Sequence, residues 1–126
     1  MDKNKNGFID IEVKQLLDWT NKGPEGCMAS DKITKEGWKV GYMYREESNS
    51  EYPDSGWTFL KGDEDEEYMN DASNHHIFAL NTICNYDPDI IPYLDAPVGT
   101  AYIRISEHEF EIDKQDKEIY FSKQDR

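Results

Sequence analysis

Cysteine is scarce in this sequence of 126 residues, and the motifs that mark common enzyme classes are missing. Cys27 and Cys84 are the only cysteines; they lie far apart and form neither a disulfide framework nor the paired spacing of a zinc ribbon. No G-x-S-x-G elbow and no glycine-rich phosphate loop is present. Two reduced thiols are therefore expected, as in a cytoplasmic protein, and a Cys27–Cys84 disulfide stays open only for a protein exported without a signal peptide.

Long apolar runs are also missing. No stretch approaches the roughly 20 apolar residues that a membrane-spanning helix needs. The first ten residues, MDKNKNGFID, are too polar for a secretory signal peptide. The sequence thus predicts a cytoplasmic protein.

Basic residues are few, and their shortage restricts the partners. The chain has 14 Lys and Arg against 27 Asp and Glu, a formal net charge of -13, and residues 61–126 hold 16 of the acids but only 6 of the bases. Such a charge repels nucleic acid and anionic membranes and attracts a basic protein surface. With 37% hydrophobic and 13% aromatic residues, the chain still has material for the core of one domain.

The apolar pattern predicts a helix followed by strands. Ile9, Val13, Leu16 and Leu17 have the spacing of one helical stripe, which predicts a helix that begins after Asp10 and ends by about residue 21. We therefore expect residues 1–26 to form an N-terminal helical appendage and residues 27–126 to form the main domain.

Period-two patterns and apolar runs fill most of the main domain. The predicted strands are 38–45, 56–60, 77–84, 101–105 and 107–113, with 77–84 as a central strand because it is apolar on both faces. Segment 87–95 contains two prolines and predicts a loop with at most one helical turn. The expected fold is a single α+β domain, with a mainly antiparallel sheet and the N-terminal helix.

The opening residues resemble a calcium loop but lack its last ligand. Asp2, Asn4, Asn6 and Gly7 occupy the first, third, fifth and sixth positions, whereas the twelfth, which needs a bidentate Glu, is Val13. A polar turn is the expectation, and calcium binding within residues 2–13 is a weak alternative.

An acidic run, residues 61–71 (KGDEDEEYMND), is the most conspicuous cluster. Such a run is ordinarily a solvated loop, but this one follows an apolar strand and also contains Tyr68 and Met69, residue types common at interfaces. A partner-binding surface and a solvated loop are both consistent with these residues. Trp38 and Trp57 are expected in the core, with a partner-facing Trp57 as the alternative.

The sequence gives little support for a catalytic site or a metal site. No pair of acids stands out as a catalytic pair, and the adjacent His75 and His76 would point to opposite faces of a strand. His108 shares the apolar face of its predicted strand with Phe110 and is expected in the core. We therefore predict a non-catalytic protein with no metal site and no cofactor.

Four segments resemble a known family: SDKIT (30–34), WKVGYMYREE (38–47), SGWTFLKGDEDEEY (55–68) and LNTICNYDPDIIPYLDAPVGTAY (80–102). They are similar to the bacterial immunity-protein 33 family of polymorphic toxin systems, also described as domain of unknown function 2185. The resemblance spans roughly residues 27–105 and leaves the calcium-like opening outside.

The resemblance implies a small cytoplasmic α+β protein that neutralises a cognate bacterial toxin by binding it, and it makes Trp57, Gly62, Asp63 and Glu64 signature positions. Combined with the charge, it predicts an acidic surface that binds a basic toxin surface. A regulatory or ligand-binding module that has no toxin as its partner is the alternative. The predicted partner-binding residues are Trp57, Asp63, Glu64, Asp65, Glu66, Glu67, Tyr68, Asp87 and Asp89.

Overall fold

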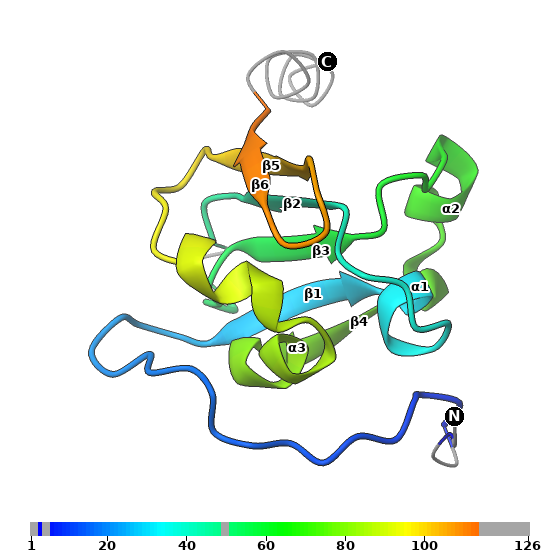
Figure 1. Cartoon of the computed structure of the whole chain (residues 1–126), viewed down its shortest axis with the longest axis horizontal. Helices are drawn as coiled ribbons and strands as arrows, with labels where there is room; N and C mark the ends of the chain where they lie inside the picture. The colour runs from blue at the N-terminus through cyan, green and yellow to red at the C-terminus, as the bar shows by residue number, and fades with distance from the viewer. Residues whose placement is uncertain (1–2, 4–5, 49–50, 114–126) are drawn as a thin grey trace.

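A central sheet organises the chain in the computed structural model, which describes residues 3, 6–48 and 51–113 (Figure 1). Within these residues six strands pair in the order β4-β1-β3-β2-β5-β6; β1 and β3 are parallel and the other neighbours antiparallel. The strands are β1 (Gly26–Ser30), β2 (Tyr42–Arg45), β3 (Trp57–Leu60), β4 (His75–Ala79), β5 (Ala101–Arg104) and β6 (Phe110–Ile112). The expected single α+β domain with a mainly antiparallel sheet is thus confirmed.

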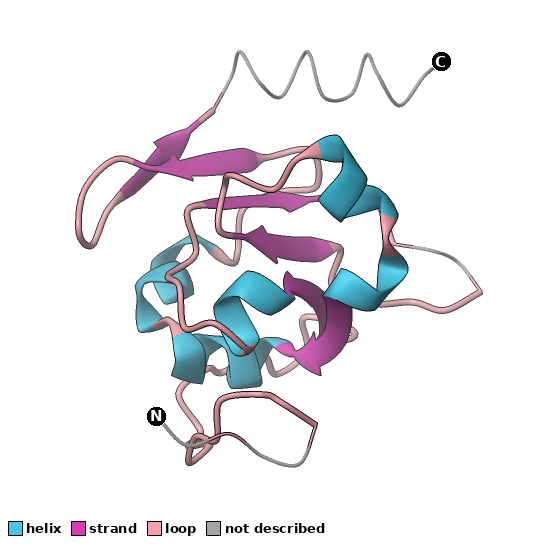
Figure 2. Cartoon of the chain, turned by 90° about the vertical axis from the view of Figure 1, so that its right-hand side faces the viewer, coloured by secondary structure: helices cyan, strands magenta, loops and turns pink. Residues whose placement is uncertain are grey.

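Short helical elements lie on both sides of this sheet (Figure 2). They are α1 (Asp31–Thr34), α2 (Glu66–Asn70), α3 (Leu80–Tyr86) and the 3-10 helices η1 (Ala72–Asn74) and η2 (Pro88–Tyr93). Segment 87–95 is more helical than the single turn expected, because η2 covers six of its residues, about two turns of 3-10 helix. None of the helices in the described part of the chain is long and apolar enough to cross a membrane.

The two faces of the sheet are covered unequally. On the face that we call the core face, Ala29, Met43 and Phe59 pack against Leu80 and Ile83 of α3, and η2 adds Ile90. On the opposite face, which we call the open face, Tyr44, Leu60 and Ala101 form a smaller cluster. Tyr42 of β2 and Met69 of α2 pack against it. The main core is therefore one-sided.

The expected N-terminal helix is wrong. The described residues between Ile9 and Glu25 contain no helix, and the predicted stripe does not face one way, since Ile9 and Leu17 are buried while Val13 and Leu16 are exposed. The segment instead runs along the domain, where Ile9 N–H donates to the Thr34 carbonyl at 2.8 Å and Leu17 and Trp19 join the core.

Side-chain amides of α3 explain why this segment is not helical. Asn81 Oδ1 accepts from the backbone N–H of Leu16 (2.9 Å) and Leu17 (3.0 Å), and Asn81 Nδ2 donates to the Lys14 carbonyl (2.9 Å). Asn85 makes a second pair of bonds with Lys14. Backbone groups that a helix would pair internally are therefore satisfied by tertiary contacts, which local periodicity does not reveal.

We expect Asn81→Ala to loosen this segment selectively. The substitution removes three hydrogen bonds to residues 14–17 and leaves a buried amide group of the segment without a partner, at a cost of about 1–3 kcal/mol. Hydrogen exchange should show faster exchange of the Leu16 and Leu17 amides and little change in β3. Asn70→Ala, at an exposed position of α2, is the control; equal exchange in both variants would contradict this account.

The predicted central strand at 77–84 is also wrong in part. Strand β4 ends at Ala79, α3 begins at Leu80, and β4 lies at the edge of the sheet. The run is apolar on both faces because two elements share it: Leu80, Ile83 and Cys84 are buried at helical spacing.

Candidate functional site

The first half of the acidic run builds a turn. Gly62, directly after β3, has φ +113°, a conformation that favours glycine, so this signature position has a backbone role. Glu64 accepts from the backbone N–H of both Lys61 and Gly62 at 2.8 Å. Asp65 then caps α2 by accepting from the Tyr68 N–H at 2.8 Å. Glu64 and Asp65 therefore hold the local backbone.

Asp63 is neutralised by two lysines. Its carboxylate is 2.9 Å from Lys61 Nζ and 2.9 Å from Lys32 Nζ, and these hydrogen bonds lower the pKa of Asp63 to about 2. Lys61 also lies 3.9 Å from the ring centroid of Trp38, and Lys32 lies 4.9 Å from that of Tyr68. Trp38 is 50% exposed, so its expected place in the core is wrong.

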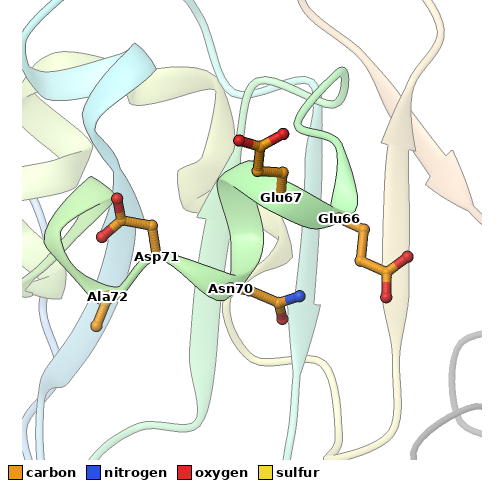
Figure 3. Close-up of a pocket in the computed structure, with 5 residues that line it drawn as sticks. All are labelled: Glu66, Glu67, Asn70, Asp71 and Ala72. Atoms are coloured by element: carbon orange, nitrogen blue, oxygen red, sulfur yellow. The ribbon is translucent and has the colours of Figure 1, made fainter.

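The second half of the run presents acids to solvent. Glu66 and Glu67, in the first turn of α2, are exposed, and their side chains make no hydrogen bond or ion pair with any described residue. Asp71 accepts from the Ser73 hydroxyl and N–H, and both bonds lower its pKa. Glu66, Glu67 and Asp71, with Asn70 and Ala72, line a shallow hollow (Figure 3). We call Glu66, Glu67 and Asp71 the α2 acids.

Partly buried side chains fix α2 against the sheet. The ring of Tyr68 packs edge-on against His75, and its hydroxyl accepts a long hydrogen bond, 3.4 Å, from Ser30. Met69 packs on the Tyr44 and Leu60 cluster. The α2 acids therefore stand on an element attached to β1, β3 and β4, rather than on a free loop.

Asp87 and Asp89 belong to a different cluster. Asp87 is 2% exposed and accepts from Arg104 Nη2 at 2.6 Å, while Asp89 accepts from Arg104 Nη1 at 3.0 Å. Although burial alone would raise the pKa of Asp89, hydrogen bonds from Arg104 and His108 lower it. His108 is exposed and lies 3.0 Å from Asp89, so its expected place in the core is wrong. Arg104 was not identified from the sequence, although it is the single charge in the apolar segment AYIRI.

Trp57, a predicted partner residue, is instead a core residue. It is 1% exposed, and its indole N–H donates to the Leu94 carbonyl at 3.0 Å. Among the predicted residues, the structure thus groups Asp63 to Tyr68 at one end of the sheet and places Trp57 and Asp87 inside the protein.

Reactive and metal-binding groups are not assembled in the described residues. No cluster of three or more His, Cys, Asp or Glu side chains there suits a metal ion. Cys27 and Cys84 are free and buried, and burial raises the pKa of Cys84 to about 12, which leaves the thiol protonated and unreactive. In the calcium-like opening, Asp2 and Asn4 lie outside the described residues.

Comparison with known proteins identifies the family. No curated protein and no solved structure matches the chain significantly. Residues 27–114, however, match the Immunity protein Imm33 domain. The matched range includes the whole acidic run and all six strands, apart from Gly26, the first residue of β1. Membership supports a toxin-neutralising role in general. The chain therefore belongs to the Imm33 immunity protein family.

Proposed function

We propose that this protein is a non-catalytic immunity protein that neutralises a cognate toxin by presenting the α2 acids to a basic surface of that toxin. The observation that carries the proposal is the position of Glu66 and Glu67, exposed and unpaired among the described residues on a helix held against the sheet. The family match supports the general role, and the net charge of -13 supports the sign of the partner surface.

The surface is smaller than the one predicted from the sequence. Asp63 pairs with Lys32 and Lys61, and Glu64 and Asp65 accept from backbone N–H groups, so reversing their charges would also disturb the fold. The α2 acids are available without such rearrangement, because Asp71 uses one carboxylate oxygen on Ser73 and Glu66 and Glu67 use none on the described residues. Tyr68 contributes at the edge of this surface.

Reversal of the charge on α2 tests the proposal. The double substitution Glu66→Lys/Glu67→Lys should weaken binding to the purified product of the neighbouring toxin gene at least tenfold and abolish rescue of cells that co-express the toxin. Association should also slow as salt rises, since the Debye length falls to about 8 Å at physiological ionic strength.

Glu12→Lys is the control for charge reversal elsewhere on the surface. Glu12 is exposed and precedes Lys14, which contacts α3 on the other side of the sheet from α2. Unchanged affinity and rescue in the α2 variant, or an equal loss in Glu12→Lys, would contradict a specific role for α2. Absence of binding by the natural protein would overturn the immunity function for this toxin.

A further inference from the structure

Exposed aliphatic side chains gather on the open face of the sheet. Cross-strand register places Met28 of β1 opposite Ile77 of β4, and Tyr42 of β2 opposite Ile103 of β5. Ile77 is 76% exposed, Met28 39% and Ile103 38%, and Ile105, which continues the alternation past β5, is 54% exposed. Large aliphatic groups this accessible on one face of a sheet are typical of an interaction surface.

These side chains form two groups with a buried cluster of the sheet between them. Met28 and Ile77 lie on the β1–β4 side, and Ile103 and Ile105 lie on the β5 side, while Tyr44 and Leu60 between them are buried under Met69. Four strand spacings separate β4 from β5, about 19 Å at roughly 4.8 Å per spacing. A standard interface of about 800 Å² per partner covers both groups together.

The net charge around this face is negative, because Lys32 and Lys61 beside α2 are paired with Asp63. The two arginines within the strands, Arg45 and Arg104, pair across from Trp57 and Phe110, which places them on the core face. Acids instead border the open face: the α2 acids at one end, and Glu111, opposite Ile103, on β6. A second copy of this chain or an anionic membrane would bring like charges together, whereas a basic protein surface would not.

We infer that the open face is the apolar part of the toxin interface, with Ile77 and Ile103 as its anchors and the α2 acids as its charged rim. The inference rests on the proposed function and specifies the partner further. The toxin surface must combine exposed apolar side chains, which pack on β1–β4 and on β5, with Lys or Arg side chains that meet α2 and Glu111. Such a division between an apolar centre and a polar rim is the usual anatomy of a specific interface.

Truncation of the two anchors tests this arrangement. Ile77→Ser and Ile103→Ser should each weaken binding to the purified product of the neighbouring toxin gene about tenfold or more, mainly through faster dissociation. Both positions are accessible in the free protein, so the thermal unfolding midpoint should stay close to that of the natural protein and show that the variants are folded.

Ile112→Ser is the matched control. Ile112 is 49% exposed on β6 but pairs with Tyr102, on the face opposite to that of Ile103, and its truncation should change affinity less than twofold. If both anchor variants bind as the natural protein does while Glu66→Lys/Glu67→Lys binds weakly, the open face is not the interface and the immunity function stands. If the natural protein does not bind the toxin, the proposed function fails and this inference fails with it.

Sedimentation tests whether a second copy of this chain covers the open face. The natural protein should sediment as a monomer over the concentrations used for binding. A dimer that Ile77→Ser dissociates would show that a second copy covers the open face, which would overturn the inference.

Discussion

Trp57→Ala should lower the free energy of unfolding by about 3–5 kcal/mol, because it removes one of the largest side chains of the core. The indole stacks near Phe59 and Tyr102, with ring centroids 6.0 Å and 6.5 Å away, and its N–H donates to the Leu94 carbonyl. Removal leaves a cavity on the core face and an unpaired carbonyl. A small domain is typically stable by about 5–15 kcal/mol, so this loss should bring the variant close to unfolding.

Trp38→Ala is the control, since of the two tryptophans expected in the core only Trp57 is buried. Trp38 is 50% exposed and contacts Lys61 by a cation–π interaction, so its truncation should cost at most about 1 kcal/mol. Urea unfolding followed by far-ultraviolet circular dichroism measures both variants. Similar losses for Trp38→Ala and Trp57→Ala would contradict the placement of Trp57 in the core.

The sheet could be predicted from the sequence because its signal is local. Segments 56–60 and 101–105 both contain strands, and the apolar residues of 56–60 are those that the sheet buries. Segment 38–45 was predicted too long, since the strand begins at Tyr42 and Trp38 precedes it, held by Lys61 rather than by a neighbouring strand.

The N-terminal segment could not be predicted, because its conformation is determined by residues far away. The spacing of Ile9, Val13, Leu16 and Leu17 suits a helix, yet Asn81 and Asn85 supply the hydrogen bonds that extended backbone needs there. Strand β1 was missed for a related reason. Its residues GCMAS show little periodicity, and its pairing with β3 and β4 joins segments 30 and 50 residues apart.

The sequence located the candidate site but did not show which of its acids are paired within the fold. The acidic run does lie at the surface of an attached helix, yet its first three acids bind Lys32, Lys61 and backbone N–H groups. Composition counts charges and does not show which are paired within the fold. Likewise Asp87 and Asp89, which are acids in the same half of the chain, face Arg104 in a separate cluster.

Asp87→Ala should be nearly as destabilising as the loss of Trp57, by about 3–5 kcal/mol, because it leaves a buried charge without its closest partner. Asp87 is 2% exposed and accepts from three groups: the Val40 N–H at 2.9 Å, the Asp89 N–H at 3.1 Å and Arg104 Nη2 at 2.6 Å. Arg104 in turn donates to the Val40 and Glu107 carbonyls. The pair thus joins η2, the segment before β2, and the β5–β6 turn.

An exposed ion pair is the control for burial, and a double mutant tests whether the loss of stability comes from the charge pair of Asp87 and Arg104. Asp95→Ala breaks the exposed pair with Lys22, at 2.8 Å, and should change stability by less than about 1 kcal/mol. Asp87→Ala/Arg104→Met should lose clearly less than the sum of the two single losses, since the second substitution removes the guanidinium that the first leaves without its closest partner. Urea unfolding of the four variants measures this, and additive losses would show that Asp87 acts through its backbone contacts alone. Because this cluster lies on the core face, all four variants that remain folded should still bind the toxin, which distinguishes acids that hold the fold from those on α2.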